Sequence, residues 1–167
     1  MILLGLTLTS CGSSGSEPDV AGGTTTTGVD VTAHQEFLAE GDAVCAEAQV
    51  EAAELARRAQ ELQARRGTIS DSELLESAAD VWNDQIELAE RFRDRLIDLD
   101  APPEDEVQVD VFLETLDEGI EIARVIKASL DDGKDPPQAL VQSYGSVAVR
   151  GNTLAQAFGF QVCGRSA

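Results

Sequence analysis

Apolar residues recur at intervals of three and four positions through most of the chain beyond residue 31, which is the spacing of helices that bury one face. Glycine and proline interrupt this pattern at Gly67, Pro102 and Gly133 and divide it into four segments. No segment shows the strict alternation of apolar and polar residues that is typical of a half-buried strand. The pattern therefore predicts an all-α domain of four helices over residues 32–167.

The first helix is predicted to run from Thr32 to about Arg66. Thr32 and Gln35 have the spacing of a capping box, in which two side chains satisfy free backbone groups at a helix start, and Gly67 suits the helix end. Its inward face is a coiled-coil-like stripe of apolar and small residues, namely Leu38, Cys45, Ala52 and Ala59 with Gly41, Ala48, Leu55 and Leu62 between them.

The second and third helices follow from similar signals. Ser70 and Glu73 form a capping box for the second helix, which must end before Pro102. Pro102 and Pro103 suit the first turn of the third helix, and Gly133 ends it. The inward positions of the second helix are Leu75, Ala78, Trp82, Ala89, Phe92, Leu96 and Leu99, and those of the third are Val109, Phe112, Leu116, Ile120, Ala123, Ile126 and Leu130.

The fourth helix is predicted to begin with Asp135 as its cap and Pro136 in its first turn, and to end at Gly159. Its inward face consists of Leu140, Tyr144, Val147, Gly151, Leu154 and Phe158. Because short connections force neighbouring helices to run antiparallel, we expect an up-down-up-down four-helix bundle. The first helix then starts at the end of the bundle where the fourth helix finishes, so Cys45 and Cys163 can meet.

Residues 1–10 are expected to form a signal peptide. Met1 to Leu8 are almost wholly apolar, yet they are too few to cross a bilayer, which takes about 20 residues. The step Leu-Thr-Ser-Cys at residues 8–11 resembles the bacterial lipobox, which implies cleavage before Cys11 and lipidation of its thiol. No Lys or Arg precedes Cys11, whereas a signal peptide begins with one, so we expect the true start of the protein to lie upstream.

Residues 11–31 are expected to be a lipidated, disordered tether. Serine, glycine and threonine dominate this segment, and it has no apolar periodicity to bury. About 20 residues of flexible coil span about 25 Å root-mean-square. We therefore expect a domain that is anchored to the cell membrane by lipid on Cys11 and that faces the extracytoplasmic side.

The charge of the chain narrows the range of partners. Thirty-one acidic and 12 basic side chains give a formal net charge of -19, which repels nucleic acid phosphates and anionic lipid head groups. We expect no nucleic acid partner, and contact with membrane lipid through the anchor instead of through charge. Because only 4% of the residues are aromatic, the core is expected to consist mainly of Leu, Ile, Val and Ala.

Two cysteines remain after lipidation of Cys11. Outside the cytoplasmic membrane such a pair is typically oxidised, so a disulfide between Cys45 and Cys163 is expected. The segments at residues 43–48 and 157–164 resemble those of small, uncharacterised actinobacterial lipoproteins, which have one cysteine near the domain start and one near its end. The resemblance supports the disulfide and implies no activity.

The sequence contains no catalytic constellation that we can identify. The single histidine, His34, lies at the start of the first helix and is expected to be solvated. Motifs for a di-iron bundle, covalent haem or a phosphate loop are absent, so we expect no cofactor. We also expect no metal site at residues 131–135, or at the carboxylate cluster of Asp98, Asp100, Glu104, Asp105, Glu106 and Asp110.

Glycines inside the helices leave two interpretations open. Gly119 and Gly151 each cost about 1 kcal/mol relative to alanine, so either the backbones pack closely there, which we favour, or a pocket is left with Gln85 and Tyr144 nearby. Our leading hypothesis is a non-catalytic helical module that binds a protein or a small ligand at the cell envelope. The alternatives are a structural spacer without a ligand and a carboxylate-dependent enzyme.

Overall fold

A computed structural model describes residues 31–164 of the chain, and they form four α-helices joined by short loops. The helices are α1 (Val31–Ala64), α2 (Asp71–Ile97), α3 (Glu106–Asp131) and α4 (Gln138–Phe158). The predicted signal peptide and Cys11 lie outside the described residues, as does the predicted tether apart from its last residue, Val31, which begins α1. Within residues 31–164 no helix is both long and apolar enough to cross a membrane.

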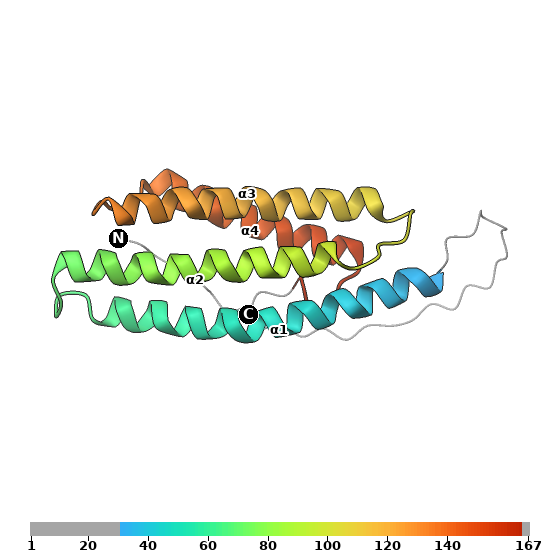
Figure 1. Cartoon of the computed structure of the whole chain (residues 1–167), viewed down its shortest axis with the longest axis horizontal. Helices are drawn as coiled ribbons and strands as arrows, with labels where there is room; N and C mark the ends of the chain where they lie inside the picture. The colour runs from blue at the N-terminus through green and yellow to red at the C-terminus, as the bar shows by residue number, and fades with distance from the viewer. Residues whose placement is uncertain (1–30, 165–167) are drawn as a thin grey trace, which may run out of the picture.

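The helices pack in chain order. Successive helices run antiparallel and side by side, which confirms the predicted all-α four-helix fold (Figure 1). The helix axes approach one another between α1 and α2, between α2 and α3, and between α3 and α4. No Cα atom of α1 lies within 8 Å of a Cα atom of α4, so the side of the bundle between these two helices is not closed by helix packing.

The predicted start of α2 is confirmed in part. The Ser70 hydroxyl accepts a hydrogen bond from the backbone N–H of Glu73 at 3.2 Å, as a capping residue does. The Glu73 carboxylate does not return to the backbone of Ser70. It forms an ion pair with Arg65 at 2.9 Å instead, and so ties the end of the first helical segment to the start of the second.

The starts predicted for α3 and α4 are wrong by a few residues. Helix α1 is described from Val31, one residue before its predicted start at Thr32. Pro102 lies in a turn before α3, where its carbonyl accepts the backbone N–H of Asp105 at 2.8 Å. Pro137, not Asp135, precedes the first residue of α4. Proline fits both of these non-helical positions because its φ is fixed and it has no backbone N–H that needs an acceptor.

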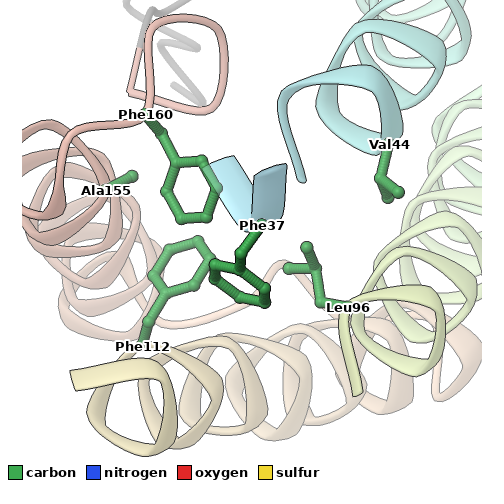
Figure 2. Close-up of a cluster of buried hydrophobic side chains, with 6 residues drawn as sticks. All are labelled: Phe37, Val44, Leu96, Phe112, Ala155 and Phe160. Carbon is green, nitrogen blue, oxygen red and sulfur yellow. The ribbon is translucent and has the colours of Figure 1, made fainter. Parts of the chain in front are cut away.

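The core consists of three clusters of buried residues, two of which pack against the same side chains, Trp82 and Tyr144. Towards the end of the bundle where α2 begins and α3 ends, Ile126 is fully buried among side chains of α2, α3 and α4. These include Trp82 and Tyr144, whose rings meet edge to face with their centroids 5.0 Å apart. At the end where α1 begins, the rings of Phe37, Phe112 and Phe160 converge beside aliphatic side chains such as Val44 and Leu96 (Figure 2). All five phenylalanines of the chain lie in this cluster or pack against it.

Ion pairs cross each of the three helix interfaces. They use most of the basic side chains in the described part of the chain, so little positive charge is left for other contacts. The interhelical pairs are Arg91–Glu51, Arg95–Glu47 and Arg58–Asp84 between α1 and α2, Arg93–Asp117 and Arg124–Glu90 between α2 and α3, and Arg150–Glu118 between α3 and α4.

Candidate functional site

Residues 159–164, which we call the C-terminal strap, run from the end of α4 across to α1. Gly159 ends α4 with a positive φ of 117°, and the backbone N–H of Phe160 bonds back to the Ala155 carbonyl at 3.1 Å. This left-handed turn directs the chain away from the axis of α4. The strap thereby lies on the side of the bundle where α1 and α4 do not pack together.

Asp42 of α1 fastens the strap. Its carboxylate accepts hydrogen bonds from the backbone N–H groups of Gln161 at 2.8 Å, Val162 at 2.7 Å and Cys163 at 3.2 Å. Gln49, two turns further along α1, donates a hydrogen bond to the Val162 carbonyl at 2.9 Å. Bonds to a charged carboxylate are stronger than those between neutral groups, so Asp42 is the main polar attachment of the strap.

A disulfide joins Cys45 of α1 to Cys163 of the strap, as the sequence predicts. The Cα atoms lie 5.0 Å apart, and 118 positions separate the two residues in the chain. A disulfide across a loop of that length lowers the entropy of the unfolded chain and so stabilises the folded state. Chain-entropy arguments give about 4 to 5 kcal/mol as an upper figure for this stabilisation. The bond also fixes the strap within one turn of Asp42.

Phe160 fills the space beneath the strap. Its ring lies 6.0 Å from that of Phe37, 6.3 Å from that of Phe112 and 5.3 Å from that of Phe158. The ring also covers Gly41, and a Cβ atom at position 41 would fall well inside van der Waals contact with it. The absence of a side chain at Gly41 is therefore what lets Phe160 enter the core.

A groove of about 280 Å³ opens between the start of α3 and the end of α4, beside this aromatic cluster. Gln108 is the only polar side chain along it, and Val107 and Val111 at its edge are 73% and 43% exposed. We call this the apolar groove, and its lining residues are Phe37, Leu96, Val107, Gln108, Val109, Val111, Phe112, Leu113, Leu154, Ala155, Ala157, Phe158 and Phe160. Such a surface can hold an apolar group of another molecule.

His34 lies at the same end of the bundle and contacts two other side chains there, whereas the sequence led us to expect a solvated side chain. Its Nδ1 lies 2.7 Å from a carboxylate oxygen of Asp105, and its ring meets that of Phe158 edge to face at 5.4 Å. Asp105 is only 6% exposed, which is rare for a carboxylate without a partner. The expectation for His34 was wrong because its partner is 71 positions away in the chain, where no local pattern shows it.

The residues that we considered for a pocket lie elsewhere. Gln85, Gly119, Tyr144 and Gly151 do not line the apolar groove. A Cβ atom at Gly151 would make ordinary contact with Thr115 at 3.7 Å, and one at Gly119 would do so with Val147 at 3.6 Å. Neither glycine is therefore needed for close approach of the backbones, and a pocket around the four residues stays a prediction.

The carboxylates show no metal-binding arrangement in the part of the chain that the structure describes. No group of three or more His, Cys, Asp or Glu side chains converges there, at the cluster around residues 98–110 or elsewhere in residues 31–164. A second hollow, of about 250 Å³, lies between α1 and α2. It is lined largely by charged side chains such as Arg58, which is paired with Asp84, so we do not regard it as a binding site.

Sequence analysis missed the apolar groove, although part of its signal was present. Val107 and Val111 are four positions apart, so they lie on one face of α3, and they do not belong to its inward stripe. This spacing indicates two neighbouring apolar side chains on the exposed surface of the helix. Single exposed valines are common, so this signal alone has little weight. Only the three-dimensional arrangement shows that they border a hollow between two helices.

Comparisons with known proteins give no lead. No protein-family model matches the chain, and neither the curated proteins nor the solved structures contain a significant match.

Two glycine-to-alanine substitutions are expected to change stability in opposite directions. Gly145→Ala on α4 meets no atom within 4 Å, so it should stabilise the fold by about 0.5–1 kcal/mol through helix propensity. Gly41→Ala gains the same propensity but must displace the buried ring of Phe160, which costs about 1–3 kcal/mol. Urea unfolding measures both, and a Gly41→Ala variant as stable as Gly145→Ala would contradict the packing beneath the strap.

The single tyrosine provides a direct test of the core around Trp82. Burial disfavours the phenolate and raises the pKa of Tyr144 above its ordinary value, so the folded state holds this proton to higher pH than the unfolded state does. The stability that the protonated Tyr144 side chain contributes is therefore fully present below about pH 10 and is lost as the pH rises above that value. Ultraviolet titration of tyrosinate should show a raised pKa in the native chain and an ordinary one in denaturant, and Tyr144→Phe should remove this part of the alkaline loss of stability. An ordinary pKa in the native chain would place Tyr144 in solvent.

Proposed function

We propose that the chain is a membrane-anchored, extracytoplasmic helical module without catalytic activity, and that it binds an apolar group of another molecule in the apolar groove. The observation that carries this proposal is the lining of the groove. Twelve of its 13 residues are apolar, and two of those at its edge are among the exposed large hydrophobic side chains of the molecule. Exposed apolar surface around a hollow is typical of a binding site.

The position of the groove agrees with a tethered module. Phe37, which lines the groove, lies less than two turns after the start of α1 at Val31, where the predicted tether joins the domain. If Cys11 carries lipid, a tether with a root-mean-square span of about 25 Å keeps this end of the bundle close to the membrane surface. The groove would then face partners or ligands at that surface.

A binding role is favoured over a carboxylate-dependent enzyme by the placement of the acidic side chains. Such an enzyme needs two carboxylates that face each other in a protected site. Asp105 is the only buried carboxylate among residues 31–164, and it is paired with His34. A spacer without a ligand is the remaining alternative, and it offers no reason for an apolar hollow beside exposed valines.

A neutral, apolar fluorophore tests the groove. N-phenyl-1-naphthylamine should bind saturably to the full chain carrying Cys11→Ser, a substitution that removes the predicted lipid and the need for detergent. Val111→Asp places a carboxylate at the edge of the groove and should weaken binding at least about tenfold, because the charge must be desolvated. Val125→Asp is the matched control, since Val125 is a 52% exposed valine of the same helix outside the groove. Fluorescence titration that shows no saturable binding, or an equal loss in both variants, would refute the proposed site.

Metabolic labelling tests the anchor. When the protein is produced in a bacterium from the upstream start that we expect, with labelled palmitate, Cys11→Ser should abolish the label, because it removes the thiol that the lipid modifies. Cys45→Ser should leave the label in place, because Cys45 belongs to the disulfide of the domain. Label that survives Cys11→Ser, or that is absent from the unaltered chain, would contradict the anchor.

A further inference from the structure

We infer that the loop between α1 and α2 is a cleavage site for a trypsin-like endopeptidase, and that cleavage leaves two chains joined by the Cys45–Cys163 disulfide. The bond that is cleaved is the peptide bond between Arg66 and Gly67. Its hydrolysis consumes one water molecule and leaves a carboxylate on Arg66 and an amine on Gly67. The inference concerns a modification of the domain and does not depend on what the apolar groove binds.

The chain is exposed without interruption around this bond. Residues 63–68, which link the last turn of α1 to the loop before α2, are all exposed, and none of residues 63–70 is buried. A Cβ atom at Gly67 would meet no other atom within 4 Å, so the space beside the bond is open. Exposed loops of small and polar residues are preferred sites of proteolytic nicking. No core side chain has to leave the bundle when this segment enters the cleft of a protease.

The bonds that shape the loop are local. The backbone N–H of Arg66 donates to the Gln63 carbonyl at 3.1 Å. The backbone N–H and the hydroxyl of Thr68 both donate to the Arg65 carbonyl, at 2.9 Å and 2.7 Å, and a β-bridge joins Arg66 to Ile69. Water can replace these bonds when the loop opens, because the segment is exposed, so opening does not require the helices to separate.

Arg66 offers the side chain that such a protease recognises. A trypsin-like protease selects a basic residue before the cleaved bond through a carboxylate in its specificity pocket. The exposed Arg66 forms no ion pair with any carboxylate of residues 31–164. Arg65, in contrast, pairs with Glu73 at 2.9 Å. The Arg66 guanidinium can therefore enter the pocket without breaking an ion pair.

The other basic residues of the described chain are less accessible to a protease. Apart from Arg65, Arg66 and Lys134, every Lys and Arg of residues 31–164 lies within one of the four helices, where the backbone is held by helical hydrogen bonds. Lys134 is exposed in the loop between α3 and α4, but Pro136, two positions further on, is buried. That residue has to leave the core before a protease can bind on both sides of the bond. The loop between α1 and α2 is therefore the preferred site.

The two halves of the domain stay joined after cleavage. Cys45 precedes the loop and Cys163 follows it, so the disulfide becomes a covalent link between the new chains. Three ion pairs and buried side chains such as Leu55 also hold α1 against α2. The predicted lipid on Cys11 belongs to the first chain, whereas all lining residues of the apolar groove except Phe37 belong to the second. Both cleavage and reduction are then needed to break the covalent connection between the anchor and most of the groove.

Limited digestion with trypsin tests the inference. The full chain carries Cys11→Ser, which removes the predicted lipid, and Arg165→Gln, which prevents trimming of the C-terminus, and it is digested in the oxidised, native state. The first cut should fall after Arg66, so the intact mass should increase by one water molecule, and reduction should then yield residues 1–66 and 67–167. A first cut elsewhere, such as after Lys134, or separation of the halves before reduction, would overturn the inference.

Arginine variants show which side chain the protease recognises. Arg65→Gln and Arg66→Gln together should slow the first cut at least about tenfold, because neither side chain then carries the charge that the pocket binds. Arg65→Gln alone should not slow the cut, and Arg66→Lys should keep the site. Lys134→Gln is the matched control in the other loop and should leave the rate unchanged. Equal rates in the double variant and the parent chain, or an equal loss with Arg65→Gln alone, would contradict the role of Arg66.

Binding of N-phenyl-1-naphthylamine separates the inference from the proposed function. The cleaved, oxidised chain should bind the fluorophore as the intact chain does, because the disulfide and the core keep Phe37 in the lining of the groove. If trypsin cuts after Arg66 but neither form binds the fluorophore, the proposed function is wrong and the inference stands. If the intact chain binds and cleavage abolishes binding, the two halves do not hold together and the inference is wrong.

Discussion

The attachment of the C-terminal strap to α1 is the interaction on which the rest of this end of the molecule depends. The backbones of α1 and α4 stay apart, and side-chain contacts such as that of Phe37 with Phe158 join the two helices at the end where α1 begins. The strap crosses the side between these two helices and is held by the Asp42 carboxylate and the Cys45–Cys163 disulfide. It carries Phe160 into the aromatic cluster, where the ring also forms part of the apolar groove.

The groove lies at the same end of the bundle. The aromatic rings of Phe37, Phe112 and Phe160 meet there, and the groove opens beside them. The pair of His34 and Asp105 joins the starts of α1 and α3 at the same end. The groove and this pair therefore both lie at the end of the bundle where the predicted tether joins the domain.

The sequence was sufficient for features that local patterns encode. Apolar spacing predicted the four helices, Ser70 predicted a cap, and short connections with two cysteines predicted the disulfide. It was not sufficient for features that depend on distances between helices. Nothing near His34 points to Asp105, and no periodicity reveals that α1 and α4 stay apart. The glycines inside the helices suggested a pocket in the middle of the bundle, whereas the groove lies at one end.

Native-state hydrogen exchange of the oxidised and reduced chain tests most directly whether the strap holds this end of the bundle together. If it does, reduction of the disulfide should increase amide exchange in residues 37–45 of α1, in the last turns of α4 and in the strap. Exchange around Ile86 and Ile120, at the centre of the α2–α3 interface, should rise only as far as the lower free energy of global unfolding requires, because these residues pack without the strap. An equal loss of protection in all four helices, or no change near Phe37, would contradict this account.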